Sequence, residues 1–139
     1  MKIYMMLASF LLFSITGWAD GSGPKKKVHV QREFVLRAGS EALVKEARLD
    51  LVFKELVEDS RCPEGVDCIW AGNGKISLTA KRDRHKSVSF ELNTMTEPKS
   101  FVYENYEITL VNLAPYPKSD KTIRPGDYLA TLKVTKKKV

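Results

Sequence analysis

The sequence predicts an all-β protein whose strands form an antiparallel β-sandwich or a flattened barrel of about seven or eight strands, with one short disulfide loop. Three observations lead to this prediction. Apolar and polar residues alternate with period two over most of the chain after residue 33. Glycine, proline and polar residues separate the alternating segments, as turns require. The only two cysteines lie close together between two of these segments.

The alternating segments before the cysteines predict three strands. Phe34 and Leu36 alternate with polar neighbours in the first, and a Gly-Ser turn separates this segment from a second one at 42–44. The third covers 48–54, where every second residue is apolar. Residues 40–48 also contain several good helix formers, so a short helix is an alternative to the second strand.

The segments after the cysteines predict the remaining strands. Alternation is clear over 75–81 and 87–92, and the charged residues between them are expected to form a hairpin turn. Shorter strands are expected at 101–103 and 106–110. Pro115 and Pro117 end the latter, because proline cannot donate to a sheet ladder. The closing strand, 128–135, is expected to place Tyr128, Ala130, Leu132 and Val134 on one face.

The first residues resemble an export signal. Lys2 supplies a short positive end, residues 3–15 are almost wholly apolar, and small residues precede Asp20. We therefore expect residues 1–19 to be a signal peptide that is cleaved after Ala19, which places the protein in the periplasm or outside the cell. A retained membrane anchor is the alternative, although the apolar run is near the lower limit for spanning a bilayer.

The rest of the chain divides into three predicted parts. Residues 20–32 are expected to form a flexible basic leader, 33–135 the β-sandwich domain and 136–139 a basic tail. The formal net charge of the chain is +6, and most of this excess lies in two lysine triplets. The triplets are read either as solvated tails or as weak contacts with anionic lipid or polysaccharide. Nucleic acid is not an expected partner, because the triplets lack interleaved aromatic residues. The candidate contacts are Lys25, Lys26, Lys27, Lys136, Lys137 and Lys138.

The cysteines are expected to form a disulfide between Cys62 and Cys68, because paired cysteines are the rule in an oxidising compartment. The chain-entropy model gives such a short ring about 2–2.5 kcal/mol of stabilisation. A metal site is disfavoured, because His29 and His85 are the only histidines and neither is near the pair in sequence. Five residues separate the cysteines, whereas the common redox motif has two. Neither a metal nor a cofactor is expected.

The ring is either a structural brace or a rigid recognition loop. Proline and glycine favour a sharp turn within it, and a braced loop loses less entropy on binding. Arg61 is expected to pair with Asp59, Glu64 or Asp67. Trp70 is expected to pack on the disulfide in the core, with an exposed binding anchor as the alternative. The candidate binding loop comprises Arg61, Pro63, Glu64, Gly65, Val66, Asp67 and Trp70.

Two segments of the chain resemble known families, and the first includes the candidate binding loop. The segment Asp59–Pro63, four further residues, and Cys68-Ile69-Trp70-Ala71-Gly72-Asn73 resemble the signature of a family of small exported bacterial proteins of unassigned function. That resemblance covers about residues 33–135 and implies no activity, cofactor or catalytic residue. Residues 125–132 are similar to the last strand of many immunoglobulin-like domains, which is why an immunoglobulin-like sandwich is one expected form of the fold.

An enzyme is not expected from this sequence. There is no Gly-x-Ser-x-Gly, phosphate loop or metal-ligand pair, and neither histidine occupies a position typical of a held base. We expect a non-enzymatic binding module that is a monomer. It is expected to recognise a protein in the envelope or outside the cell through the loop 62–68. A protease inhibitor is one alternative. The other is a structural, envelope-associated protein that binds anionic surfaces through its lysines.

Overall fold

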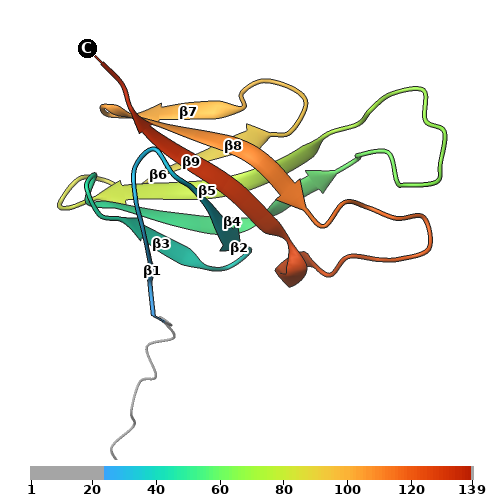
Figure 1. The fold of residues 1–139 in the computed structure, drawn as a ribbon, viewed down its shortest axis with the longest axis horizontal. Helices are drawn as coiled ribbons and strands as arrows, with labels where there is room; N and C mark the ends of the chain where they lie inside the picture. Colours follow the sequence, from blue (N-terminus) through green and yellow to red (C-terminus); the bar gives the residue numbers. More distant parts are fainter. Residues whose placement is uncertain (1–23, 139) are drawn as a thin grey trace, which may run out of the picture.

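A computed structural model of the chain describes residues 24–138, which form nine β-strands and one short 3₁₀ turn. The strands form two sheets that pack face to face (Figure 1). The all-β sandwich with one short disulfide loop is thus confirmed. The strands are β1 (Lys26–Val28), β2 (Glu33–Arg37), β3 (Glu41–Val44), β4 (Leu49–Asp59), β5 (Gly74–Arg82), β6 (Val88–Asn93), β7 (Ser100–Tyr103), β8 (Tyr106–Ala114) and β9 (Leu129–Lys136), and the 3₁₀ turn is η1 (Pro125–Asp127).

The strand order follows the order of the chain except at β1 and β2. One sheet has the order β1-β3-β4-β5-β6 and the other β2-β9-β8-β7. All pairs are antiparallel except β1 with β3, which is parallel. From β3 to β6, and again from β7 to β9, each strand pairs with the next, and β9 pairs back to β2. Most connections therefore join neighbouring strands within one sheet, and the two sheets together form the sandwich.

The core lies between the two sheets and follows the alternation seen in the sequence. In β9, Ala130, Leu132 and Val134 are fully buried while Leu129 is exposed, as predicted. The partner sheet presents Leu51 and Phe53 of β4, which are also fully buried. Burying such side chains contributes about 1.5–3 kcal/mol each, so the apolar faces are the main source of stability. The largest wholly buried side chains are Phe53, Leu36, Leu49, Leu51, Ile76, Leu78, Leu92, Ile108, Leu113, Leu132, Val44 and Val134.

The beginning of the described chain differs from the expected flexible leader. Residues 26–28 form β1, whose Val28 is only 5% exposed, and the Lys45 amide donates to the carbonyl of Val28. The reason is that Val28, the apolar residue of this strand, packs its side chain against the hydrophobic core. Lys136 likewise belongs to β9 instead of a tail. The predicted signal peptide, 1–19, lies outside the described residues.

Residues 40–48 form β3 and a turn, not the alternative helix. Ala42 and Val44 are fully buried, and β3 pairs with β1 on one side and β4 on the other. Tertiary pairing therefore overrides the helix propensity of this segment. Within residues 24–138, no helix has the length and apolarity needed to cross a bilayer.

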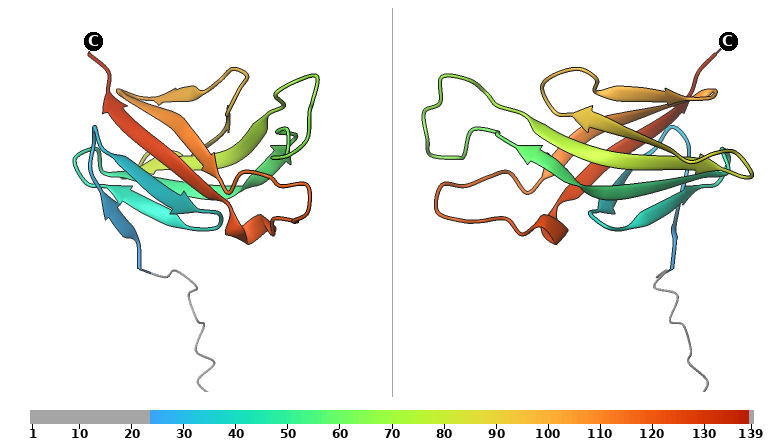
Figure 2. Two further views of the ribbon diagram at one scale, coloured as in Figure 1. Left: turned by 45° about the vertical axis from the view of Figure 1, so that its right-hand side comes forward. Right: turned by 180° about the vertical axis from the view of Figure 1, so that it is seen from behind.

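The sandwich has two different ends (Figures 1 and 2). The loop end carries three long connections: the β4–β5 loop (60–73), the β6–β7 loop (94–99) and the β8–β9 loop (115–128). The turn end carries four short connections, and the chain reaches its C-terminal end beside them (Figure 1). It comprises the β1–β2 (29–32), β3–β4 (45–48), β5–β6 (83–87) and β7–β8 (104–105) turns.

Candidate functional site

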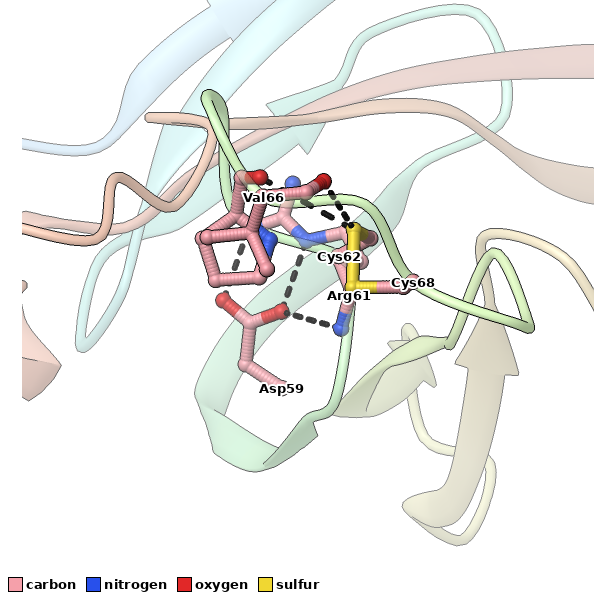
Figure 3. The surroundings of a disulfide bond; sticks show 6 residues. Asp59, Arg61, Cys62, Val66 and Cys68 are labelled. Atoms are coloured by element: carbon pink, nitrogen blue, oxygen red, sulfur yellow. Dashed lines mark hydrogen bonds and ion pairs between the residues drawn. A yellow bond between two sulfur atoms is a disulfide. The ribbon is translucent and has the colours of Figure 1, made fainter.

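The β4–β5 loop is an extension of a hairpin, closed by the disulfide. The Ser60 amide donates to the carbonyl of Asn73 at 2.8 Å, and the Cys62 amide donates to that of Ala71 at 3.1 Å. Beyond these bonds, Cys62 and Cys68 are linked, with their Cα atoms 5.9 Å apart (Figure 3). The predicted disulfide is therefore confirmed. The loop is held at its base by hairpin bonds and in its outer part by a covalent ring.

Gly72 is required where the two arms of this hairpin approach each other. Its φ is +71°, in the left-handed region that glycine adopts readily. A Cβ atom at this position would lie 1.8 Å from the carbonyl oxygen of Ser60. Any side chain here would force the arms apart. Gly72 therefore allows the close approach of the two arms that carry the loop with Ile69 and Trp70.

Arg61 points inward from the loop and is only 6% exposed. Its Nε and Nη2 donate to the two carboxylate oxygens of Asp59 at 2.7 and 2.8 Å, a forked pair (Figure 3). Its Nη1 donates to the carbonyl of Leu113 at 2.6 Å, and Nη2 also donates to that of Pro115 at 3.0 Å. Arg61 thus connects the disulfide loop to the end of β8. The expected pairing of Arg61 with an acidic neighbour is found with Asp59.

Tyr128 completes this buried network. Its hydroxyl donates to Asp59 Oδ2 at 2.9 Å. Burial and the neighbouring carboxylate raise the pKa of Tyr128 to about 12. Burial by itself raises the pKa of Asp59, but the hydrogen bonds from Arg61 and Tyr128 and the Arg61 charge together lower it below its ordinary value. The network therefore holds Asp59 ionised and Tyr128 neutral at pH 7.

The β8–β9 loop is tied to the disulfide loop at a second place. The Glu64 amide donates to the Pro117 carbonyl at 2.9 Å, and the Glu64 carboxylate lies 3.6 Å from Lys118 Nζ. The Arg61 guanidinium also lies 5.2 Å from the centre of the Tyr116 ring, a cation–π distance. The two loops consequently support each other at the loop end.

Trp70 lies on the surface, which overturns the expectation that it packs on the disulfide in the core. Its side chain is 78% exposed, and that of its neighbour Ile69 is 89% exposed. The reason is that Arg61 occupies the interior beneath the loop, where it satisfies Asp59 and two carbonyls. Ile69 and Trp70 are the most exposed large apolar residues of the described chain.

The remaining residues of the candidate binding loop lie at its outer edge. Glu64, Gly65 and Asp67 are exposed, Val66 is 44% exposed and Pro63 is half-buried. Glu64 pairs with Lys118 rather than with Arg61. Sequence reasoning missed Tyr116, Lys118 and Tyr128, since strand alternation does not reveal contacts between two loops.

The two lysine triplets have different environments. In the first triplet, Lys25 Nζ lies 3.2 Å from Asp50 and 3.4 Å from Glu41. Lys26 Nζ donates to the Val35 carbonyl at 3.0 Å, so two of these three cations are already used within the fold. The second triplet, Lys136, Lys137 and Lys138, is exposed.

Both histidines have carboxylate partners at the turn end. His29 Nδ1 lies 2.6 Å from Glu46, and this hydrogen bond, with backbone amides, lowers the pKa of Glu46 to about 2. His85 Nδ1 lies 3.0 Å from Glu104. No group of three His, Cys, Asp or Glu side chains within residues 24–138 is placed to hold a metal ion. The arrangement that stands out chemically is the presentation of Ile69 and Trp70 on a braced loop.

Comparison of the chain with protein-family models, curated proteins and solved structures finds no match. The resemblance to a family of small exported proteins accordingly stays a prediction from the sequence.

Proposed function

We propose that this protein is an exported, non-enzymatic binding module that captures a protein partner with the end of its disulfide loop. The observation that carries the proposal is the exposure of Ile69 and Trp70, at 89% and 78%, on a loop whose backbone is fixed. The exposed side chains of Ile69 and Trp70 do not contribute to folding, since the core is complete without them. Tryptophan is prominent among the residues that dominate protein–protein binding energy.

The rigidity of the loop supports the proposal. The disulfide, the hairpin bonds and Arg61 order the loop before any partner arrives, so association does not have to supply that ordering. Export is part of the proposal: residues 1–19 have the features of a signal peptide, and disulfides persist mainly in oxidising compartments. The partner is accordingly a protein of the envelope or the exterior.

The test compares crosslinked capture from envelope extract by the oxidised protein and by single variants. Trp70→Ala is expected to weaken capture by about 2–4 kcal/mol, the loss typical of an anchor residue. Val111→Ala is the matched control, because Val111 is 46% exposed but lies on β8, away from the loop. The free energy of unfolding of each variant should differ from that of the unaltered protein by no more than about 0.5 kcal/mol, because both side chains are exposed.

Substitution of Glu64, Val66 and Asp67 by Ala maps the rest of the surface. If Trp70→Ala and all three loop variants fold and capture the same proteins as well as Val111→Ala does, the loop is not the recognition site. Intact-mass analysis of this chain, purified from its own envelope, checks cleavage before Asp20. If the partner is a protease, inhibition of its activity by the unaltered protein distinguishes an inhibitor from a simple binder.

A further inference from the structure

The turn end gathers charged side chains that lie far apart in the sequence. Hydrogen bonds and ion pairs connect its turns one after another: His29 to Glu46, Arg48 to Asp83 at 4.0 Å, and His85 to Glu104. The Lys137 amide donates to the Asn105 carbonyl at 2.8 Å, which places the second lysine triplet beside the β7–β8 turn. Four turns and this triplet therefore lie together at one end of the sandwich (Figure 2).

Positive charge is in excess on this surface. Its carboxylates, Glu46, Asp83 and Glu104, each already have a basic partner within the turn end. The exposed cations outnumber them. These cations are Arg32, Lys45, Arg48, Arg84, Lys86, Lys136, Lys137 and Lys138. The loop end differs, because acidic and basic side chains are close to balance there.

A hollow lies between two of the turns. It is a shallow, open depression lined by Arg48, Asp83, Arg84 and His85. Arg84 and Arg48 therefore flank a surface that a phosphate, sulfate or carboxylate group can reach from solvent. Arginine is suited to this role, because its planar fork of donors matches the oxygen atoms of such groups.

We propose that the turn end binds a linear polyanion, a polymer that carries repeated phosphate, sulfate or carboxylate groups. Its contacts are Arg48 and Arg84 at the hollow and the exposed triplet Lys136–Lys138. The site is separate from Ile69 and Trp70, which lie at the opposite end of the sandwich, and does not depend on the function proposed for them.

The absence of an apolar anchor favours a polymer over a bilayer. The exposed large apolar residues of the described chain all lie outside the four turns and the triplet. A protein that settles on a membrane gains much of its affinity from apolar side chains inserted below the headgroups. A polymer requires no such insertion, and its repeated charges can contact several of the turns in succession.

The test measures binding of inorganic polyphosphate and of phosphatidylglycerol vesicles at several salt concentrations. The unaltered protein is expected to bind polyphosphate, with affinity that falls as salt rises because bound counterions are released. The double variant Arg48→Gln, Arg84→Gln should lose about tenfold or more in affinity, since it removes two phosphate contacts and their share of counterion release. Replacing Lys136, Lys137 and Lys138 by Gln should have an effect of similar size.

The matched control removes the same charge from the other end. Lys99→Gln with Lys121→Gln alters two exposed loop-end lysines and should change affinity by less than about twofold. An equal loss in the control would overturn the proposal, because binding would then follow net charge alone. Binding to vesicles without binding to polyphosphate would also overturn it, in favour of a membrane surface. Circular dichroism spectra of all variants establish that they are folded.

Discussion

At the scale of single residues, Arg61 is the side chain on which the loop end depends. It is buried, it is charged, and its donors are matched to Asp59 and to the carbonyls of Leu113 and Pro115. A buried ion pair of this kind adds little net stability compared with apolar residues, but loss of one partner leaves an uncompensated charge. Lysine cannot replace it, because an ammonium group lacks the fork that reaches the carboxylate and two carbonyls in one plane.

Asp59→Asn is expected to destabilise the protein by about 3 kcal/mol, because it leaves Arg61 buried without its counter-charge. The pH dependence follows from the pKa of Asp59, which is lower in the folded than in the unfolded chain. The stability that Asp59 contributes is therefore present above its unfolded pKa of about 3.9 and is lost as pH falls through the lower folded value. The free energy of unfolding in urea, measured from pH 2 to 7, checks both points.

The variant should show a smaller decrease between pH 4 and pH 2 than the unaltered protein, since it has no carboxylate to protonate at this position. Tyr128 acts in the opposite range. Its pKa is raised to about 12, so its contribution is present below its ordinary pKa of 10.0 and is lost as pH rises through 12. Equal acid sensitivity of the variant and the unaltered protein would show that Asp59 is not the group involved.

The sequence identifies the Asp59–Arg61 pair only as one of three possibilities and misplaces Trp70. Charge and proximity along the chain suggest partners for Arg61, but they do not show that its guanidinium lies inside the fold. Once Arg61 takes the interior position beneath the loop, Trp70 is left in solvent. The contacts that decide this, with the carbonyl of Leu113 at the end of β8 and that of Pro115 in the loop after it, leave no trace in the residue pattern.

At the scale of elements, alternation predicts most of the strands because each has one face in the core. It misses β1 and leaves β3 open between a strand and a helix, because these elements are short or have few apolar residues. β1 is paired through three residues of which only Val28 is buried, and β3 has a composition that also suits a helix. In both cases the paired strand, β3 for β1 and β4 for β3, decides the conformation, so the information lies outside the segment.

Gly72→Ala tests the geometry of the β4–β5 hairpin. The added Cβ would lie 1.8 Å from the Ser60 oxygen, so the arms must separate, and the loss of stability should exceed the roughly 1 kcal/mol of left-handed strain alone. Gly65→Ala is the matched control: its φ is +81°, but nothing lies within 4 Å of the new atom. Thermal unfolding compares the two, and a smaller effect at Gly72 than at Gly65 would contradict the assigned contact.

At the scale of the whole molecule, two ends with different chemistry are held apart by one apolar core. The loop end presents Ile69 and Trp70, and the turn end presents cations with Lys136–Lys138 beside them. The long strands β4, β5 and β8 run between the ends, so neither surface obstructs the other (Figure 1). The core does not include the disulfide, which acts on the loop alone.

Replacing Cys62 and Cys68 by Ser should therefore leave the sandwich folded. The expected loss is about 2 kcal/mol or less, because the ring is short and the hairpin bonds and Arg61 still hold the base of the loop. Amide hydrogen exchange should increase for 63–70 and stay unchanged for β4 and β9. Global unfolding of the variant at room temperature would show that the disulfide supports the core.

The pairing of β2 with β9 has a consequence for the order in which the fold is completed. Residues 33–37 leave the ribosome well before their partners 129–133. Until then the second sheet lacks its closing pair, and Phe34 and Leu36 have no opposite strand to cover them. Completion of this sheet is thus coupled to the appearance of a strand about ninety residues further along the chain, a non-local pairing of the kind that slows folding.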